Sequence, residues 1–154
     1  MRRKVEGGCQ CGAVRYSIEA EPKMIYACHC TICQRQSGSA FGMAVVFGDG
    51  KIEMAGIEPG TFERDGVGRK MRCIFCPKCG SRIYHQWFTE AGDIPFVSIK
   101  PGTFDDASWV IPDFHIWTQH KQPWIKFSAD DVVYEQRMPA ERSKPFFERA
   151  GKAT

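Results

Sequence analysis

Three tight cysteine clusters constrain this chain more than any other feature of its sequence. Seven of the eight cysteines fall into them, as Cys9-x-Cys11, Cys28-x-Cys30-x-x-Cys33 and Cys76-x-x-Cys79. Thiolates at such spacings are typical zinc ligands, and four of them complete a closed tetrahedral site. Seven therefore supply one closed site and leave three for a second site with an open position. Structural zinc sites are usually closed, whereas catalytic ones keep a position for water or substrate.

The closed site is predicted to use Cys9, Cys11, Cys76 and Cys79. Two residues between Cys76 and Cys79 let the chain turn so that both sulfurs face one ion, and Gly80 suits a position with positive φ. In an extended segment the side chains at i and i+2 point the same way, which would place Cys9 and Cys11 together. An ion held by both pairs would fix the N-terminal strand to the strands around the second turn.

The open site is predicted to use Cys28, Cys30 and Cys33. Alternation puts Cys28 and Cys30 on one side, and Cys33, one turn later, can close a three-sulfur cup. His29 stands between two ligands, so its ring would point away; hydrogen bonding or a substrate-facing role is favoured over ligation. The alternative is a second structural site completed by a distant ligand such as Cys73, although a core position in its strand is favoured for that thiol.

The composition is that of a folded, soluble protein with one domain. The chain has 154 residues, of which 43% are hydrophobic and 12% aromatic. No apolar run approaches the roughly 20 residues that span a bilayer, and the basic N-terminus lacks the apolar stretch of a secretory signal. We therefore expect a cytoplasmic protein without membrane contact. Stable disulfides are rare in that compartment, which disfavours a disulfide framework as the alternative explanation of the cysteines.

The formal net charge of +3 disappears if both metal sites are filled. Seven thiolates add seven negative charges and two Zn²⁺ ions add four positive ones, so the net charge becomes zero. Nucleic-acid binding depends on a basic surface, and this function is therefore disfavoured.

Short strands separated by glycine dominate the predicted secondary structure. Residues 14–18 alternate as in a half-buried strand, and Gly-Asp-Gly between residues 41–47 and 51–55 predicts a hairpin. Further strands are predicted over 69–75, 82–87 and 96–100, edge strands or loops over 116–117 and 124–127, and one helical turn over 31–36. The sequence thus predicts a mainly β fold, a small zinc-stabilised domain with short antiparallel sheets.

The chain is predicted to divide into a domain over residues 1–138 and a C-terminal tail over residues 139–154. The tail is rich in charged and small residues and contains Pro145. A solvated, partly disordered terminus is favoured over a partner-binding tail. Phe146 and Phe147 are the residues that could pin the tail to the domain.

The cysteine clusters belong to a longer series of motifs over about residues 7–127. The series is Gly8-Cys-Gln-Cys-Gly12, Cys28-His-Cys-Thr-Ile-Cys-Gln-Arg35, Ser37-Gly-Ser39, Phe75-Cys-Pro-Lys-Cys-Gly80, Gly102-Thr-Phe-Asp-Asp106, Pro112-Asp-Phe-His-Ile116 and Pro123-Trp124. In this order and spacing it resembles the glutathione-dependent formaldehyde-activating enzyme family. The resemblance implies a β-tent-like fold with one structural and one catalytic zinc, on the two cysteine sets derived above. It also implies that glutathione is joined to formaldehyde, the reverse of a carbon–sulfur lyase reaction.

The implied mechanism assigns roles to residues near the cup. A glutathione thiolate at the open position would attack the aldehyde, and the resulting alkoxide would need a proton or a positive neighbour. His29 and His115 are the candidate catalytic histidines, with a structural hydrogen-bonding role as the alternative for each. Arg35 could meet a glutathione carboxylate or be a surface arginine. Asp105 and Asp106 are expected to shape a turn.

Other functions compete with this one. The first is a zinc-stabilised binding module or thiol carrier without enzymatic activity, which the fold alone does not exclude. The second is redox chemistry at Cys73 or the cup, which predicts a cysteine that alkylates quickly while zinc stays bound. Trp87, Trp117 and Trp124 are expected in the core or in a pocket wall. A homo-oligomer is compatible with the sequence.

Overall fold

The protein is built mainly of antiparallel strands, as a computed structural model shows for residues 1–48, 51–66 and 69–148. The strands are β1 (Arg3–Gly8), β2 (Val14–Cys28), β3 (Gly42–Gly48), β4 (Glu53–Gly56), β5 (Gly60–Gly66), β6 (Arg69–Phe75), β7 (Arg82–Thr89), β8 (Gly92–Ile99) and β9 (Phe114–Ile116). The helical elements are α1 (Thr31–Ser37), α2 (Ala140–Glu148) and the short 3₁₀ segments η1 (Pro101–Thr103) and η2 (Thr118–His120). Among these described residues, no helix has the length and apolar character needed to cross a bilayer.

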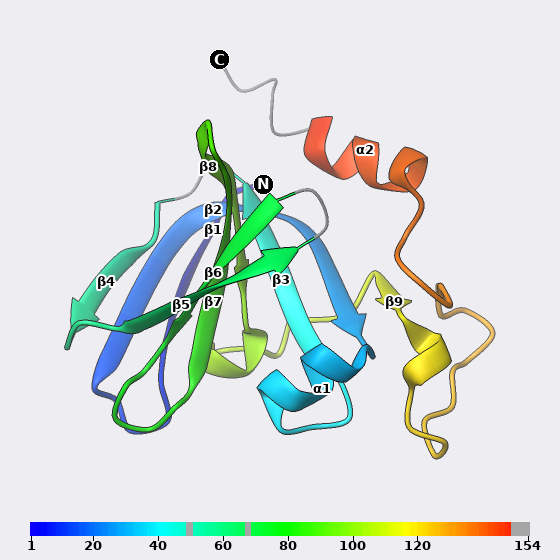
Figure 1. The fold of residues 1–154 in the computed structure, drawn as a ribbon, viewed down its shortest axis with the longest axis horizontal. Helices are drawn as coiled ribbons and strands as arrows, with labels where there is room; N and C mark the ends of the chain where they lie inside the picture. Colours follow the sequence, from blue (N-terminus) through cyan, green and yellow to red (C-terminus); the bar gives the residue numbers. More distant parts are fainter. Residues whose placement is uncertain (49–50, 67–68, 149–154) are drawn as a thin grey trace.

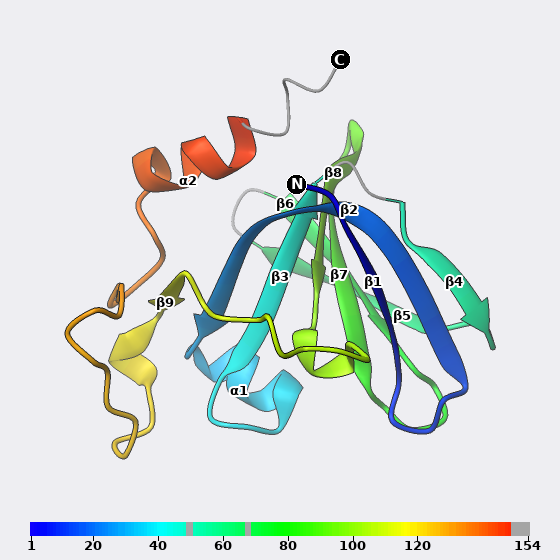
Figure 2. The ribbon, with the colours of Figure 1, turned by 180° about the vertical axis from the view of Figure 1, so that it is seen from behind.

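The strands are connected in the order β1-β2-β3-β8-β7-β6-β5, and β4 and β9 both attach to β2. The pairs along this path are antiparallel, whereas β9 runs parallel to β2. Figures 1 and 2 show the strands gathered at one end of the molecule and spread apart at the other, where α1 lies. This arrangement confirms the predicted mainly β fold.

Strand β2 is the central element because four other strands pair with it. Its first half pairs with β1 and β4, and its second half pairs with β3 and β9. Val14, Tyr16 and Ile18 are buried in alternation, as expected for a strand with one face on the core. The register shifts between Pro22 and Met24, where proline has no N–H to donate to the ladder.

The segment after β8 crosses the first strands and closes the core over them. Gly7 in β1 bridges to Phe104, and the Tyr16 hydroxyl lies 2.7 Å from Thr103 Oγ1. The predicted turn shaping by the two aspartates is confirmed for Asp106, whose Oδ1 accepts a hydrogen bond from the Ser108 N–H. Asp105, the neighbouring aspartate, forms an ion pair with Arg15 of β2. Apolar, polar and charged contacts therefore all hold this segment against the sheet.

The C-terminal segment packs over the second half of β2. The ring of Phe114 in β9 stacks on Tyr26 at 5.9 Å and meets Phe146 of α2 at 6.1 Å between centroids. The predicted anchoring of the tail is therefore confirmed for Phe146, while the Phe147 side chain lies outside the described part. Residues 140–148 of the predicted tail form the helix α2, which this apolar contact holds against β9.

Most predicted strands are present, but one predicted pairing is wrong. The strands expected over residues 69–75, 82–87 and 96–100 are β6, β7 and the end of β8, and residues 14–18 begin β2. The expected hairpin does not form, since β4 pairs with β2 and the turn residues 49–50 lie outside the described residues. The reason is that β2 and β8 already pair with the two edges of β3. Residues 124–127 form a loop.

We predict that Gly7→Ala destabilises the protein strongly. A Cβ at this position would stand 2.3 Å from Thr103 O and 2.5 Å from the Tyr16 hydroxyl oxygen, so the crossing segment would have to move. Overpacking of this kind costs about 1–3 kcal/mol of unfolding free energy, which urea denaturation would measure. Gly102→Ala is the matched control, because a Cβ there meets nothing within 4 Å. Equal midpoints for the two variants would contradict the prediction.

Candidate metal centres and the adjoining cavity

Two turns bring together a four-cysteine group made of Cys9, Cys11, Cys76 and Cys79. Their Sγ atoms all lie within 4.8 Å of one another. The first pair lies in the turn between β1 and β2, which the Gly12 N–H closes by donating to Cys9 O at 3.0 Å. The extended conformation predicted for this pair is therefore wrong, although the pairing of the sulfurs is as predicted. A turn is possible because Gly12 adopts a φ of +73°.

The second pair of this group occupies the turn between β6 and β7. Gly80 N–H donates to Cys76 O at 2.8 Å, and Gly80 has the positive φ of 74° that its place in the sequence predicts. Hydrogen bonds from the side chain and backbone of Ser81 lower the pKa of Cys79 to about 5. Donors around a sulfur favour its thiolate form, which is the form that binds metal.

A three-cysteine group forms where β2 meets α1. Cys28 ends β2, Cys30 caps the N-terminus of α1, and Cys33 lies in its first turn; the three Sγ atoms are within 4.8 Å of one another. Cys33 N–H donates to Cys30 Sγ at 3.4 Å, and Gln36 Nε2 lies 3.6 Å from Cys33 Sγ. Hydrogen bonds from the neighbouring thiols, followed by those from backbone N–H groups, lower the pKa of Cys30. Cys30 is thus favoured to ionise first.

A cavity of about 510 Å³ lies beside the three-cysteine group and has all three cysteines in its lining. The rest of its wall comes from distant parts of the chain and includes Tyr26, Arg64, Asp65, Met71, His85, Trp87, Lys100, Trp117 and His120. Three sulfurs at the wall of a cavity leave space for a further ligand atom on the cavity side. The four-cysteine group, by comparison, provides a complete tetrahedral donor set.

Three polar residues of this wall were not predicted from the sequence. Burial lowers the pKa of Lys100 to about 8, against the opposing effect of the Cys33 sulfur. Burial and then the charges of Lys100 and Arg82 lower the pKa of His85 to about 2, so this ring is neutral. One feature of the sequence could have drawn attention to Lys100, because it is the charged residue at the end of a predicted apolar strand. His85 and His120 belong to no motif that would have distinguished them.

The predicted catalytic histidines lie behind the three-cysteine group and do not line its cavity. His29 is fully buried, and its Nε2 lies 3.1 Å from His115 Nδ1. The rings of Phe41 and Phe127 lie 5.2 and 5.6 Å from the His29 ring, so it is enclosed by aromatic groups. Burial lowers the pKa of His29 to about 4, followed by the charge of His115. This hydrogen bond joins the residue between Cys28 and Cys30 to β9.

Comparison with known proteins identifies the relatives of the chain. The profile of the glutathione-dependent formaldehyde-activating enzyme family matches residues 4–120. The chain belongs to this family. One relative, from Halomonas elongata, is named as a candidate glutathione-dependent formaldehyde-activating enzyme, and it is 29% identical over 131 residues that cover 81% of this chain and 82% of the relative. A crystal structure of a Rhodobacter sphaeroides protein matches with a TM-score of 0.46 and 20% identity, over 65% of this chain and 87% of that one.

The other residues considered in the sequence analysis differ in whether they line the cavity. Arg35 is exposed on α1 and does not line the cavity beside the three-cysteine group. Trp87 and Trp117 are in the cavity wall as expected, whereas Trp124 is 70% exposed, which makes that expectation wrong. Cys73 is fully buried in β6 and belongs to neither cysteine group, as predicted.

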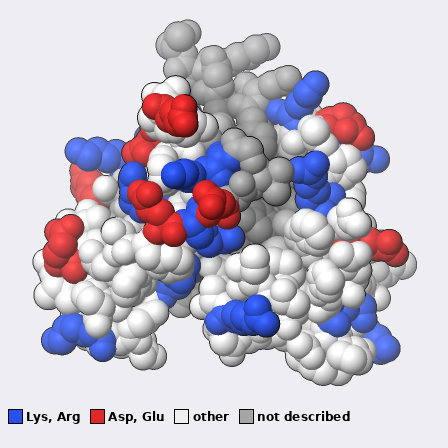
Figure 3. All heavy atoms as spheres, viewed as in Figure 1, with Lys and Arg blue, Asp and Glu red and all other residues white. Residues whose placement is uncertain are grey.

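Charge on the surface of this family member is mixed where it can be seen. On the face drawn in Figure 3, Lys and Arg side chains are interspersed with Asp and Glu. The described residues of this face form no continuous basic stripe of the kind that tracks a phosphate backbone.

We predict that His85 makes the fold sensitive to mild acid. Its pKa is about 2 when folded and near 6.5 when unfolded, so it stabilises the fold above pH 6.5 and this contribution falls as the pH drops. Between pH 7 and pH 5 the native protein should lose about 2 kcal/mol more unfolding free energy than His85→Gln. Gln keeps an acceptor for Arg82 but cannot take up a proton. Denaturant titrations of both proteins at the two pH values measure the difference, and parallel pH profiles would rule it out.

Proposed function

We propose that this protein joins a thiol, glutathione or a similar one, to formaldehyde or another small aldehyde. The observation that carries the proposal is the position of Cys28, Cys30 and Cys33 at the wall of a cavity of about 510 Å³. Membership of the formaldehyde-activating family supports the pair of substrates. Formation of the carbon–sulfur bond is the reverse direction of a carbon–sulfur lyase reaction.

Zinc fits both cysteine groups in donor chemistry and in spacing. Thiolates about 2.3 Å from a tetrahedral zinc lie about 3.8 Å apart, and the Sγ atoms of each group lie within 4.8 Å of one another. The four-cysteine group would complete the coordination of one ion and hold two turns together. The three-cysteine group would leave one position of a second ion, where coordination would make a substrate thiol a thiolate at neutral pH. We also propose a cytoplasmic location, where such thiols stay reduced.

The addition requires a sulfur, a carbonyl carbon and a proton at one place. The sulfur forms a bond to the carbon, the π electrons of the carbonyl move to its oxygen, and this oxygen takes up the proton that the thiol released. Lys100 and His120 line the cavity and could face that oxygen with a positive charge or a proton. His29 and His115 lie behind the cysteines, and we assign them a supporting role. The indoles of Trp87 and Trp117 supply apolar wall.

The test is the rate of exchange between formaldehyde and its glutathione adduct, followed by exchange NMR. Such adducts form without an enzyme, so the quantity of interest is the rate above the uncatalysed background. The zinc-loaded native protein should raise this rate, and Cys30→Ser should return it to background while keeping the fold. Cys73→Ser is the matched control, because Cys73 belongs to neither cysteine group and should keep the native rate.

Two other outcomes would change the conclusion. A rate increase that survives Cys30→Ser would contradict the assignment of the reaction to the three-cysteine group. Thiol binding by fully metallated protein without any rate increase would favour the alternative function, a thiol carrier or binding module.

We predict that the four-cysteine group determines the stability of the fold, whereas the three-cysteine group determines the exchange rate. Cys76→Ser removes a fully buried donor of the former group. The zinc content should fall by about one ion per chain, and the unfolding free energy by several kcal/mol, since structural zinc binding is worth about 10 kcal/mol or more. Elemental analysis and denaturant unfolding measure both quantities. If Cys30→Ser destabilised the protein more than Cys76→Ser, the two groups would have the opposite roles.

A further inference from the structure

A second cavity, of about 500 Å³, adjoins the cavity beside the three-cysteine group. The two cavities share Gln36, Gly42 and Lys100 in their walls. The shared wall stands beside Cys33, because a Cβ built on Gly42 would lie 3.2 Å from Cys33 Cβ and Gln36 Nε2 lies 3.6 Å from Cys33 Sγ. A molecule whose sulfur lies at the three-cysteine group would have to pass this shared wall to reach the second cavity.

The second cavity has two cationic side chains in its wall. These are Arg82 and Lys100, and none of its described lining residues is Asp or Glu, although the Cys79 sulfur, which favours the thiolate form, also reaches this wall. Hydroxyl donors also line it, from Ser37, Ser39, Ser81 and Thr103. Two cations with hydroxyl groups and without a carboxylate form a lining that favours an anionic ligand.

The guanidinium of Arg82 is held in place by neutral partners. Its Nη1 lies 3.2 Å from Gln36 Oε1 and 3.0 Å from His85 Nε2, and its Cζ lies 4.6 Å above the Phe62 ring. His85 is neutral, so neither of these two partners offsets the charge; the buried Cys73 thiol is a further neighbour of the guanidinium. In the described part of the chain no carboxylate forms an ion pair with Arg82.

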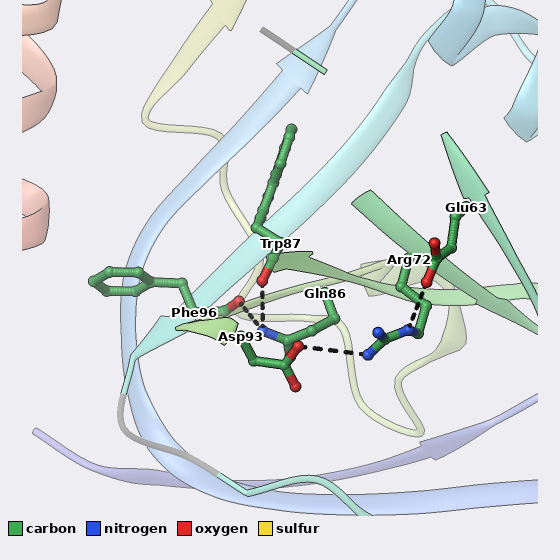
Figure 4. Close-up of polar contacts among 6 residues, drawn as sticks. All are labelled: Glu63, Arg72, Gln86, Trp87, Asp93 and Phe96. Atoms are coloured by element: carbon green, nitrogen blue, oxygen red, sulfur yellow. Dashed lines mark hydrogen bonds and ion pairs between the residues drawn. The ribbon is translucent and has the colours of Figure 1, made fainter. Parts of the chain in front are cut away.

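Arg72 on the neighbouring strand shows the opposite arrangement. Its guanidinium also lies over an aromatic ring, that of Phe88, with 4.8 Å between Cζ and the ring centroid. However, it is bound by two carboxylates, with Nε 3.4 Å from Glu63 Oε1 and Nη1 3.5 Å from Asp93 Oδ1 (Figure 4). Two arginines in similar stacking thus differ in whether their charge is paired within the protein.

Gln36 connects Arg82 to the three-cysteine group. Its Oε1 accepts from Arg82, and its Nε2 lies 3.6 Å from Cys33 Sγ, so one amide side chain separates the guanidinium from a sulfur ligand. Thiols such as γ-glutamyl-cysteinyl-glycine carry carboxylates a few bonds from their sulfur. The separation between the cation and the sulfur site suits such a molecule.

We propose that Arg82 binds a carboxylate of the substrate thiol and selects acidic thiols over neutral ones. This inference rests on the proposed function for the position of the substrate sulfur. It assigns the carboxylate contact that was predicted for Arg35 to a residue that lines the cavity. Arginine matches a carboxylate with paired N–H groups, and a guanidinium already fixed in place loses little freedom on binding.

The test uses S-methylglutathione, which keeps both carboxylates of glutathione but has no thiol to ionise. Isothermal titration calorimetry would compare it with its dimethyl ester on the zinc-loaded native protein. We expect the ester to bind about 10- to 100-fold more weakly, because hydrogen bonds to charged groups contribute this much to affinity. Arg82→Met should weaken binding of the acid by a similar factor and leave binding of the ester unchanged. Arg72→Met, the matched control, should keep the native preference.

Equal affinity of the native protein for acid and ester, or no binding of either, would overturn the proposal, and neither result depends on a variant that folds. A preference for the acid that survives in folded Arg82→Met would overturn it as well. The measurement involves no aldehyde and no carbon–sulfur bond. A failure of the exchange reaction would therefore reject the proposed function without deciding the carboxylate site, and the reverse also holds.

Discussion

The backbone ladder of β2 is the interaction on which both cysteine groups depend. The turn before this strand holds Cys9, whose Sγ accepts a hydrogen bond from Val14 N–H at 3.3 Å, and the last residue of the strand is Cys28. Pairing with β1, β3, β4 and β9 keeps β2 in register on both edges. A slip by one residue would turn every side chain to the opposite face. One strand therefore positions a cysteine group at each of its ends.

The closeness of neighbouring cysteines could be predicted from the sequence because it depends on short turns. Two cysteines separated by one or two residues must lie close together, whatever the fold, and glycines at positions 12 and 80 permit the backbone that this requires. The backbone conformation of this segment was harder to predict, because either a strand or a turn can place the Cys9 and Cys11 sulfurs on the same side. Predicting the partner of β4 required knowing that β3 would be paired on both edges, which is a property of the whole sheet.

The cavity wall could not be predicted for a related reason. Lys100, His85 and His120 come from different parts of the chain, and the fold brings them to the cavity wall over long sequence distances. None of them stands at a diagnostic spacing from the others. His29 and His115 could be singled out because they lie within motifs, yet they contact each other and do not line the cavity. Motifs near a metal site thus include residues that hold ligands in place as well as residues that face the substrate.

The support behind the three-cysteine group also sets an order of assembly. The hydrogen bond between His29 and His115 joins residues 86 positions apart, and β9 pairs with β2 beside Cys28. Contacts of such separation form late, because the loop between them must close first. During synthesis the N-terminal part of a chain emerges first, so the four-cysteine group can assemble once residue 79 has left the ribosome. The three-cysteine group gains its contacts with β9 later, once residues 114–116 have been made, so the four-cysteine group can form first.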